Sequence, residues 1–459
     1  MPYPGYPFAQ THPDRLATIA TLLGLSPAPV TVCRVLELGC GDGGNLVPMA
    51  YALPGSHFSG IDLSAAAVAR AARVAGVLDL GNLDVRQADL AALPPLGTFD
   101  YVIAHGVYSW VPAQERDALL AACQGHLAPE GVAYVSYDAL PGGYLREVTR
   151  QMLRWHVRDV DDPAERIAQA RALLGALAAT AEAATGVQRT VAEQAARALE
   201  QPDASLFHDE LAERHQAVLF ADFIAHAERH GLRYLGEADF FEMMVPGPLA
   251  EAVAELDHPL AREQYLDFFK GRMFRQTLLC HANVERHEPD PARMGGMLAA
   301  SPARPDGDPA AGRVTFRGPR GASLTTDEPH AKAAMLALGE AWPDAVPVAD
   351  VGGAPLHGLL MQAYAANLVQ LHVWTPELTT TPSERPVASA LARLQATEGT
   401  RVTNLRHATV EVADDLGRRL IRLLDGTRDR PALLRELARP ADELERSLAG
   451  LAAAALLEA

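Results

Sequence analysis

Lysine is nearly absent from this chain of 459 residues, where it occurs only at Lys270 and Lys332. Lysine and arginine together number 40, against 57 aspartates and glutamates, so the formal net charge is -17 at pH 7. This deficit of positive charge argues against nucleic acid or an anionic membrane as a partner, because both bind basic surfaces. We therefore expect no nucleic-acid partner and no membrane insertion, and the acidic balance favours basic substrates.

Cysteine is also scarce. The four cysteines form no CxxC pair, and none is separated from a histidine by the spacing found in zinc sites. We therefore predict no metal site, and unpaired cysteines fit a reduced cytoplasm. The N-terminal residues contain no apolar core of signal-peptide length, and no run approaches the ~18 uninterrupted apolar residues of a membrane span. The expected location is cytoplasmic.

Short β-type runs alternate with helical patterns between residues 34 and 137. The runs are RVLEL, HFSGIDL, LDVRQA, FDYVIA and GVAYVSY, and segments such as SAAAVARAARVAG separate them. This rhythm predicts an α/β fold in which helices cover both faces of a parallel sheet.

The composition changes three times after this region. Alanine-rich sequence from 161 to 201 predicts two long helices broken near Gly186, and strand signals return at 231–244 and 274–284. A stretch dense in Pro, Gly and Asp then predicts a linker. The predicted domains are a core at 1–160, a helical insertion at 161–230, completion of the core sheet at 231–286, the linker at 287–312 and a C-terminal domain at 313–459.

The stretch VLELGCGDGGN, residues 35–45, follows the first predicted strand and breaks into four glycines. Gly39, Gly41 and Gly44 have the GxGxxG spacing, which formally allows a dinucleotide. Glu37 and Asp42 argue against one, because two carboxylates beside a pyrophosphate cost electrostatic energy. S-adenosylmethionine fits better, since it has no phosphate and carries a sulfonium and an ammonium group.

The ends of the later strands support the same cofactor. Asp62 closes the second strand, where a carboxylate can accept hydrogen bonds from both ribose hydroxyls. Asp89 follows the third strand and can accept from the adenine amino group, with Ala88 and Leu90 beside the ring. Capping of the helix that begins near Ala65 is the alternative role for Asp62. The fourth strand ends in FDYVIAHGVYSWVP, which places His105, Tyr108 and Trp110 at the same edge of the sheet. The glycine loop and these three strand ends are four features in chain order, and together they favour the cofactor.

These residues resemble a known family. The segments ELGCGDGGN, GIDLS, ADL and FDYVIAHGVYSWV resemble class I S-adenosylmethionine-dependent methyltransferases. YPFAQTHPDRLATIATLLG, LPGGY and the FHDEL to TLLC region resemble, more narrowly, bacterial methyltransferases with a regulatory domain, a subgroup that includes lysine methyltransferases of outer-membrane proteins. The resemblance implies a Rossmann-like seven-stranded core, a helical dimerisation region and a C-terminal α+β domain of winged-helix character.

The sequence departs from the family pattern in the segment expected to face the substrate, where Asp138 and Gly143 stand in place of an Asn and an aromatic residue. The cofactor-binding residues that we predict are Glu37, Gly39, Gly41, Asp62, Leu63, Ala88, Asp89 and His105.

Methyl transfer from a sulfonium is a direct displacement, so positioning supplies much of the acceleration and no metal is required. A lysine amine, with a reference pKa of about 10.4, must first lose a proton. His105, Tyr108, Tyr137 and Asp138 are the candidate acceptors. Tyr108 and Trp110 can instead form aromatic walls around a cationic group, with core packing as the alternative. The predicted catalytic set is His105, Tyr108 and Trp110.

We expect the acceptor to be an accessible lysine on a protein, because the chain is acidic and extends well beyond a minimal core. The alternatives are a methyltransferase of small molecules and a non-catalytic regulator that binds the cofactor. The alanine-rich helices also predict a two-fold homodimer, since small residues permit close helix contact.

Overall fold

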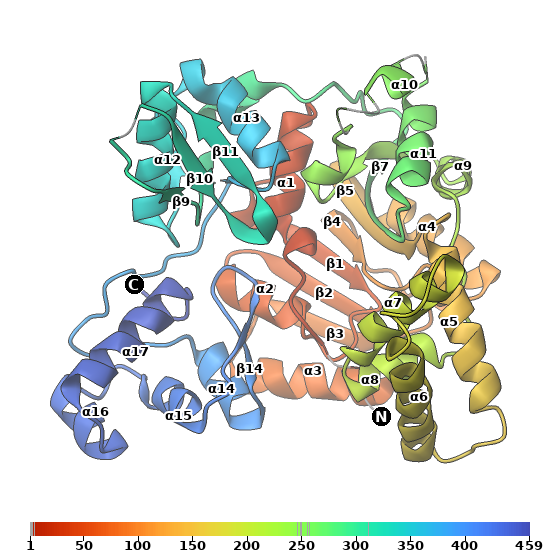
Figure 1. The fold of residues 1–459 in the computed structure, drawn as a ribbon, viewed down its shortest axis with the longest axis horizontal. Coiled ribbons are helices and arrows are strands. Elements are labelled where there is room, and N and C mark those ends of the chain that lie inside the picture. Colours follow the sequence, from red (N-terminus) through yellow and green to blue (C-terminus); the bar gives the residue numbers. More distant parts are fainter. Residues whose placement is uncertain are drawn as a thin grey trace.

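The computed structural model describes residues 3, 5–245, 247, 250–254, 256, 258–310 and 312–459. Figure 1 shows a central sheet between helices, a second small α/β unit beside it and a C-terminal helical unit. Among the described residues, no helix is long and apolar enough to cross a membrane. The remaining positions of the predicted domains, 1, 2, 4, 246, 248, 249, 255, 257 and 311, lie outside the described residues.

The central sheet has seven strands in the order β3-β2-β1-β4-β5-β7-β6. β7 runs antiparallel to both β5 and β6, and the other neighbours are parallel. The predicted seven-stranded Rossmann-like core is therefore confirmed. The strands are β1 (Arg34–Leu38), β2 (His57–Asp62), β3 (Leu83–Gln87), β4 (Phe99–Ala104), β5 (Leu127–Asp138), β6 (Leu232–Glu237) and β7 (Phe274–His281).

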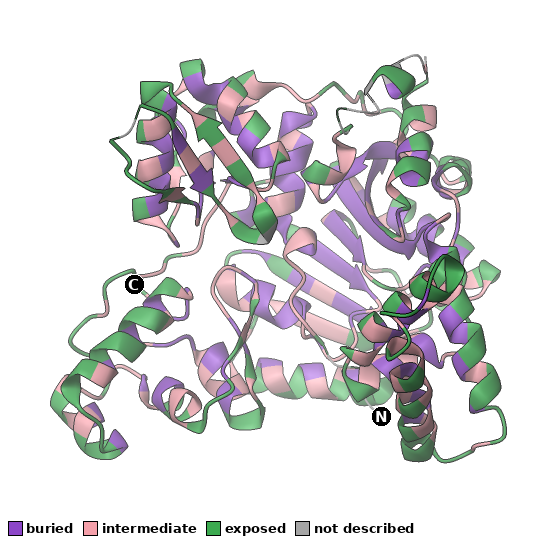
Figure 2. Cartoon of the chain, in the orientation of Figure 1, coloured by how far each residue is buried: buried purple, intermediate pink, exposed green. Residues whose placement is uncertain are grey.

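Both faces of this sheet are buried, as Figure 2 shows for the central strands. One apolar cluster joins the sheet to α1 and α2, and a second joins its other face to α4 and α9. Strands such as β1, in which four consecutive residues are buried, are typical of a sheet that helices cover on both sides. The helices are α1 (Pro13–Leu22), α2 (Leu46–Ala52), α3 (Ala65–Val77), α4 (Ala113–His126), α9 (Phe220–Arg229), α10 (Ala250–Ala254) and α11 (Pro259–Lys270).

The predicted helical insertion follows the fifth strand. Asp162 caps α6 by accepting a hydrogen bond from the N–H of Glu165, and Gly186, with φ +54°, precedes α7. Ala170, Ala195 and Ala198 pack with Leu153 in one apolar cluster. Their small side chains therefore serve contacts within the chain. The helices are α5 (Gly143–His156), α6 (Pro163–Ala178), α7 (Val187–Leu199) and α8 (Asp203–Ser205).

The predicted linker at 287–312 differs from the structure. It contains β8 and β9, which pair with strands of a second α/β unit, and Met294 and Met297 are buried there. The Pro, Gly and Asp residues that suggested a linker lie in a 3-10 helix at Pro291–Gly296, in β9 and in the turns beside them, while apolar residues between them enter the core. This unit contains β8 (Leu298–Ala300), β9 (Arg304–Asp306), β10 (Val314–Arg317), β11 (Ser323–Thr326), α12 (Pro329–Ala341), β12 (Val346–Pro347), α13 (His357–Ala365) and β13 (Gln370–His372).

The region after residue 312 contains two hydrophobic cores, where the sequence predicted one domain. The first core belongs to the second α/β unit, and the last residues form a helical unit with its own core and a two-stranded hairpin. Helices with one short hairpin are the elements of a winged helix. They are α14 (Ala390–Glu398), β14 (Arg401–Thr403), β15 (Thr409–Glu411), α15 (Asp415–Leu423), α16 (Arg430–Leu437) and α17 (Ala441–Ala453).

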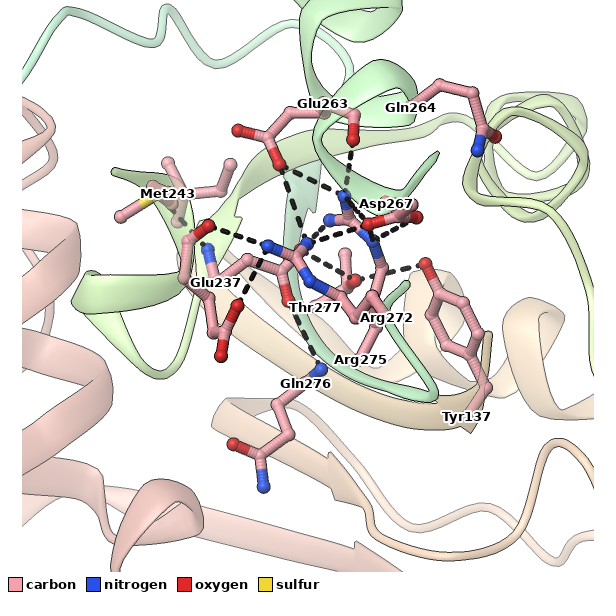
Figure 3. A network of polar contacts seen from close by, with 12 residues as sticks. Tyr137, Glu237, Met243, Glu263, Gln264, Asp267, Arg272, Arg275, Gln276 and Thr277 are labelled. Carbon is pink, nitrogen blue, oxygen red and sulfur yellow. Dashed lines mark hydrogen bonds and ion pairs between the residues drawn. The ribbon is translucent and has the colours of Figure 1, made fainter. Parts of the chain in front are cut away.

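A buried arginine joins β6, β7 and α11 (Figure 3). The guanidinium of Arg275, which is 1 % exposed, donates to Asp267 at 2.8 and 2.9 Å and to the Glu237 carboxylate. It also donates to the Glu263 carboxylate at 3.1 Å, and it lies over the Phe220 ring. Arg272 pairs with Asp267 at 3.0 Å and lies 3.9 Å from Glu263, so removal of Arg275 leaves mainly the buried Glu237 carboxylate without its cation.

We predict that Arg275→Met lowers the free energy of unfolding by about 3 to 5 kcal/mol, the usual cost of breaking a buried ion pair. Urea unfolding of the full chain measures this loss. Arg317→Met is the matched control, because Arg317 pairs with Asp306 at an exposed site and its loss costs about 1 kcal/mol or less. Equal losses in the two variants contradict the prediction.

Candidate functional site

A cavity of about 1190 Å³ lies at the edge of the sheet where β1, β2, β4 and β5 end. The core, the N-terminal segment and the region around residues 208–214 all contribute to its lining. Parallel α/β sheets bind ligands at the carboxyl ends of their strands, so this is the expected place for a cofactor. Of the predicted cofactor residues, the cavity brings together Glu37, Gly39, Gly41, Asp62 and His105.

The glycine loop turns sharply at this edge. Gly39 and Gly41 have φ of +78° and +55°, a region that side chains other than glycine rarely adopt. A Cβ at Gly41 meets no atom within 4 Å, so the space beside its backbone is open. The loop therefore presents bare backbone to the cavity, as close approach of a ligand requires.

Asp62 lines the cavity next to this loop. Its Oδ2 accepts a hydrogen bond of 2.9 Å from the N–H of Gly41, and its Oδ1 accepts one of 2.8 Å from the N–H of Ser64. Each carboxylate oxygen keeps a lone pair, because it has two acceptor sites. The carboxylate is thus fixed in orientation and can still accept from two hydroxyls.

Glu37 supplies a second carboxylate, which is only 3 % exposed. Its Oε1 accepts a hydrogen bond of 2.7 Å from the amide of Asn45, while its Oε2 is buried with no partner. Burial raises the pKa of Glu37 to about 8, from an ordinary value of 4.5. A cationic ligand favours the ionised form of this buried acid, whereas a phosphate opposes it, so the site fits a ligand with a positive charge. This is the match expected for S-adenosylmethionine.

Asn45 holds Glu37 in place through a set of contacts from distant parts of the chain. Its Oδ1 accepts three hydrogen bonds: from the N–H of Phe8 at 3.0 Å, from the hydroxyl of Thr11 at 3.1 Å and from Nε2 of His407 at 2.9 Å. These donors fix which way the amide points, so its NH₂ group faces Glu37. Asn45 ends the glycine stretch, but its role was not predicted from the sequence, because its partners are distant in the chain.

His105 lies on the cavity wall and stacks on Phe8, with ring centroids 3.8 Å apart. Its Nδ1 is 2.9 Å from the hydroxyl oxygen of Tyr134. Burial lowers the pKa of His105 to about 4, so the ring is neutral near pH 7. A neutral, stacked imidazole acts as a wall here and carries no positive charge that repels a sulfonium.

The far half of the cavity contains Trp110, Asp138, Arg146 and Asp209. Arg146 Nη1 donates to Asp138 Oδ1 at 3.1 Å, and the Arg146 guanidinium carbon lies 5.3 Å from the centre of the Trp110 ring. The burial of Asp138 opposes ionisation, but His215 and Arg146 outweigh it and lower the pKa of Asp138. Asp138 is therefore an ionised structural partner.

Asp209 differs from Asp138 in its surroundings. Burial raises the pKa of Asp209 to about 6, although Arg146 opposes this rise. The hydroxyl of Tyr3 donates to its Oδ2 at 3.5 Å. Sequence reasoning missed Asp209 as a site residue, although the FHDEL segment that contains it carried part of the family resemblance.

Tyr108 does not reach the cavity, in contrast to the prediction. Its side chain is buried against the edge of Phe223, and its hydroxyl oxygen lies 2.8 Å from Nδ1 of His226. The N–H of Trp110 donates to the carbonyl of Val107, so residues 107–110 form a turn. This turn leaves Tyr108 in the core while Trp110 lines the cavity.

Three predicted cofactor residues also lie outside the cavity lining. The side chain of Leu63 is 68 % exposed, and Ala88 is partly buried. Asp89 is exposed and accepts a hydrogen bond from the N–H of Ala91. Asp89 follows the carboxyl end of β3 by two residues.

We predict that Glu37→Gln reduces the pH dependence of stability of the ligand-free protein. The pKa of Glu37 is raised on folding, so its contribution to stability is complete below about pH 4.5 and is lost as pH rises through about 8. The native chain should lose up to about 1.4 kcal/mol per pH unit relative to the variant in that window. Thermal unfolding of both proteins across pH measures this, and parallel curves contradict it.

Three family models match separate parts of the chain. A methyltransferase domain matches residues 36–133, a predicted methyltransferase regulatory domain matches 202–281, and a PKMT C-terminal winged-helix domain matches 384–455. The glycine loop and Asp62 fall within the first match, and Asp209 falls within the second.

Individual relatives agree with these matches. The uncharacterized protein RP789 of Rickettsia prowazekii is 30% identical over 470 residues, which cover 95% of this chain and 84% of that protein. A trans-aconitate 2-methyltransferase of Deinococcus radiodurans is 36% identical over 106 residues, covering 23% of this chain and 38% of that enzyme.

The fold is shared with PKMT2 from Rickettsia typhi, whose solved structure matches with a TM-score of 0.90 at 24% identity over 99% of this chain and 100% of that chain. The structure of PKMT2 in complex with AdoHcy matches equally well. With a cavity suited to a cationic, phosphate-free ligand, the protein is an enzyme that uses S-adenosylmethionine. The chain belongs to the S-adenosylmethionine-dependent methyltransferases that join a methyltransferase domain, a regulatory domain and a PKMT winged-helix domain.

Proposed function

We propose that this methyltransferase N-methylates lysine side chains of a protein substrate. The observation that carries the proposal is the acidic lining of one cavity that extends from the glycine loop to the region around Asp209. Three arginines line the cavity, against six carboxylates. The carboxylates are Glu37, Asp42, Asp62, Asp138, Asp209 and Glu213.

The size of the cavity supports a second ligand beside the cofactor. Its volume of about 1190 Å³ exceeds the roughly 300 to 1,000 Å³ of cavities that hold one drug-sized molecule. The cavity walls come from the core and from the region of the regulatory-domain match. A long, flexible lysine side chain suits such a space, because only its tip must reach the reacting atoms.

Each cofactor-facing residue has a proposed role. The unpaired oxygen of Glu37 faces positive charge, Asp62 accepts from the ribose hydroxyls, and the backbone at Gly39 and Gly41 allows close approach. Leu63, Ala88 and Asp89 are proposed to flank the adenine. When bound, S-adenosylmethionine supplies a methyl group on a positively charged sulfur.

The acceptor side requires a group that holds the lysine and takes its proton. We propose Asp209, because its carboxylate lines the far half of the cavity and its pKa of about 6 leaves it ionised near neutral pH. Trp110 is proposed as an aromatic wall beside the acceptor, and the guanidinium carbons of Arg146 and Arg150 each lie 5.3 Å from the centre of its ring. Arg146 pairs more closely with Asp138 and Glu210, at 3.1 and 3.0 Å, than with Asp209, at 3.9 Å.

We predict that labelled S-adenosylmethionine transfers its label to lysine residues of protein in a cell lysate, identified by mass spectrometry of modified peptides. Asp209→Asn should lower kcat by about 100-fold and leave cofactor affinity unchanged. In the native enzyme, kcat should fall as the pH drops below about 6, where Asp209 becomes protonated. Asp203→Asn is the control, since Asp203 is exposed and pairs with Arg171.

Label found only in a small metabolite supports the alternative, a methyltransferase of small molecules, and contradicts the proposal. Cofactor binding without any label transfer indicates the non-catalytic regulator. An Asp209→Asn variant with unchanged kcat removes Asp209 from the mechanism and leaves the lysine acceptor standing.

We propose that the protein acts as a homodimer in the cytoplasm. One face of α5 supports the dimer, because it exposes a row of large apolar side chains: Tyr144, Leu145, Val148, Met152 and Trp155. Rows of this kind mark interaction surfaces. The four cysteines support the location, since all are buried and unpaired.

We predict a dimer by light scattering at micromolar concentration, and a monomer for the double variant Val148→Glu, Trp155→Glu. Both side chains are exposed on α5, so the charges should not disturb the fold of the subunit. Val187→Glu is the control, because Val187 is an exposed apolar residue on α7. A native chain that is monomeric contradicts the dimer.

A further inference from the structure

Two histidines and an aspartate converge next to Tyr108, outside the cavity lining. His226 lies on α9 and His230 directly follows that helix, and Asp117 lies on α4. Nε2 of His226 and Nε2 of His230 are 3.3 and 2.9 Å from the same oxygen of Asp117. Among the described residues, these three form the one group of this kind whose ligand atoms all lie within 4.8 Å of one another.

We propose that this group binds a divalent transition-metal ion, with Zn²⁺ as the ion that fits it best. Two imidazole nitrogens and one carboxylate oxygen are a donor set that zinc uses, with a water in the fourth position. At zinc–ligand distances of about 2.0 to 2.1 Å, tetrahedral donors lie about 3.3 Å apart, close to the separations found here.

The spacing of the two histidines brings His230, which follows α9 directly, next to His226 in the last turn of that helix. Residues four apart are neighbours on a helix surface, and the rings have centroids 5.5 Å apart. The side chain of Asp117 is 63 % exposed, so ions and a water ligand have access from solvent. The prediction of no metal site was based on cysteine spacing, which carries no information about this histidine pair.

Tyr108 provides an independent observation for the same site. Its hydroxyl oxygen lies 2.8 Å from Nδ1 of His226, the ring nitrogen that does not face Asp117. Histidine ligands of metals generally have a hydrogen-bond partner at the second nitrogen, which fixes the tautomer and the ring orientation. A buried tyrosine at this position leaves Nε2 of His226 directed at the shared centre.

The position of the site indicates a structural role. A bound ion ties α4 of the core to α9, which lies within the regulatory-domain match. Through Tyr108 it also supports the turn that carries Trp110 to the cavity. The ion lies apart from the proposed methyl acceptor, so this inference does not depend on the proposed function.

The test is calorimetric titration of the tag-free, chelator-treated full chain with Zn²⁺, together with the visible absorption of bound Co²⁺. We expect one ion per chain and a higher melting temperature with Zn²⁺. Tyr108→Phe should weaken binding by about 10- to 100-fold. His230→Ala and Asp117→Asn should weaken it further, and Asp117 is exposed enough for its variant to fold.

His330→Ala is the control, because exposed His330 pairs with Glu328 and no third ligand is grouped with them. Its Zn²⁺ affinity should equal that of the native chain. Absence of saturable Zn²⁺ binding by the native chain overturns the proposal. Native-like affinity in both Asp117→Asn and His230→Ala overturns it as well.

Discussion

The hydrogen bond from the Asn45 amide to the buried carboxylate of Glu37 is the contact on which the cofactor half of the cavity depends. A carboxyl group this deeply buried lowers the stability of the fold unless it is hydrogen-bonded. Asn45 donates to only one of its two oxygens. The other oxygen stays available to a cationic ligand. The buried acid therefore lowers the stability of the fold and in return prepares the site for positive charge.

Asn45 also connects units that are far apart in the sequence. Phe8 and Thr11 precede the sheet, and His407 belongs to the C-terminal unit, yet all three donate to the same amide oxygen. A second connection runs from Asp14 on α1, which accepts from the N–H of Trp374 at 2.9 Å. The winged-helix unit is thus structurally coupled to the cofactor site.

The fold was largely predictable, because strands such as β1 and the glycine loop are local patterns whose physical meaning does not depend on distant residues. Asp62 and Glu37 were found for the same reason. The sequence did not indicate Asn45, Asp209 or the group of Asp117, His226 and His230, since the contacts and proposed roles of these residues depend on partners distant in the chain. Tyr108 was misplaced because sequence spacing does not show which way a turn directs its side chains.

The affinity of the His407→Asn variant for S-adenosylmethionine tests most directly whether this coupling controls the cofactor site. Asparagine tolerates the positive φ of +55° at this position, and His407 does not line the cavity. The account predicts binding weakened by about three- to tenfold, the effect of losing one buried hydrogen bond that orients Asn45. An unchanged dissociation constant in a folded variant contradicts it.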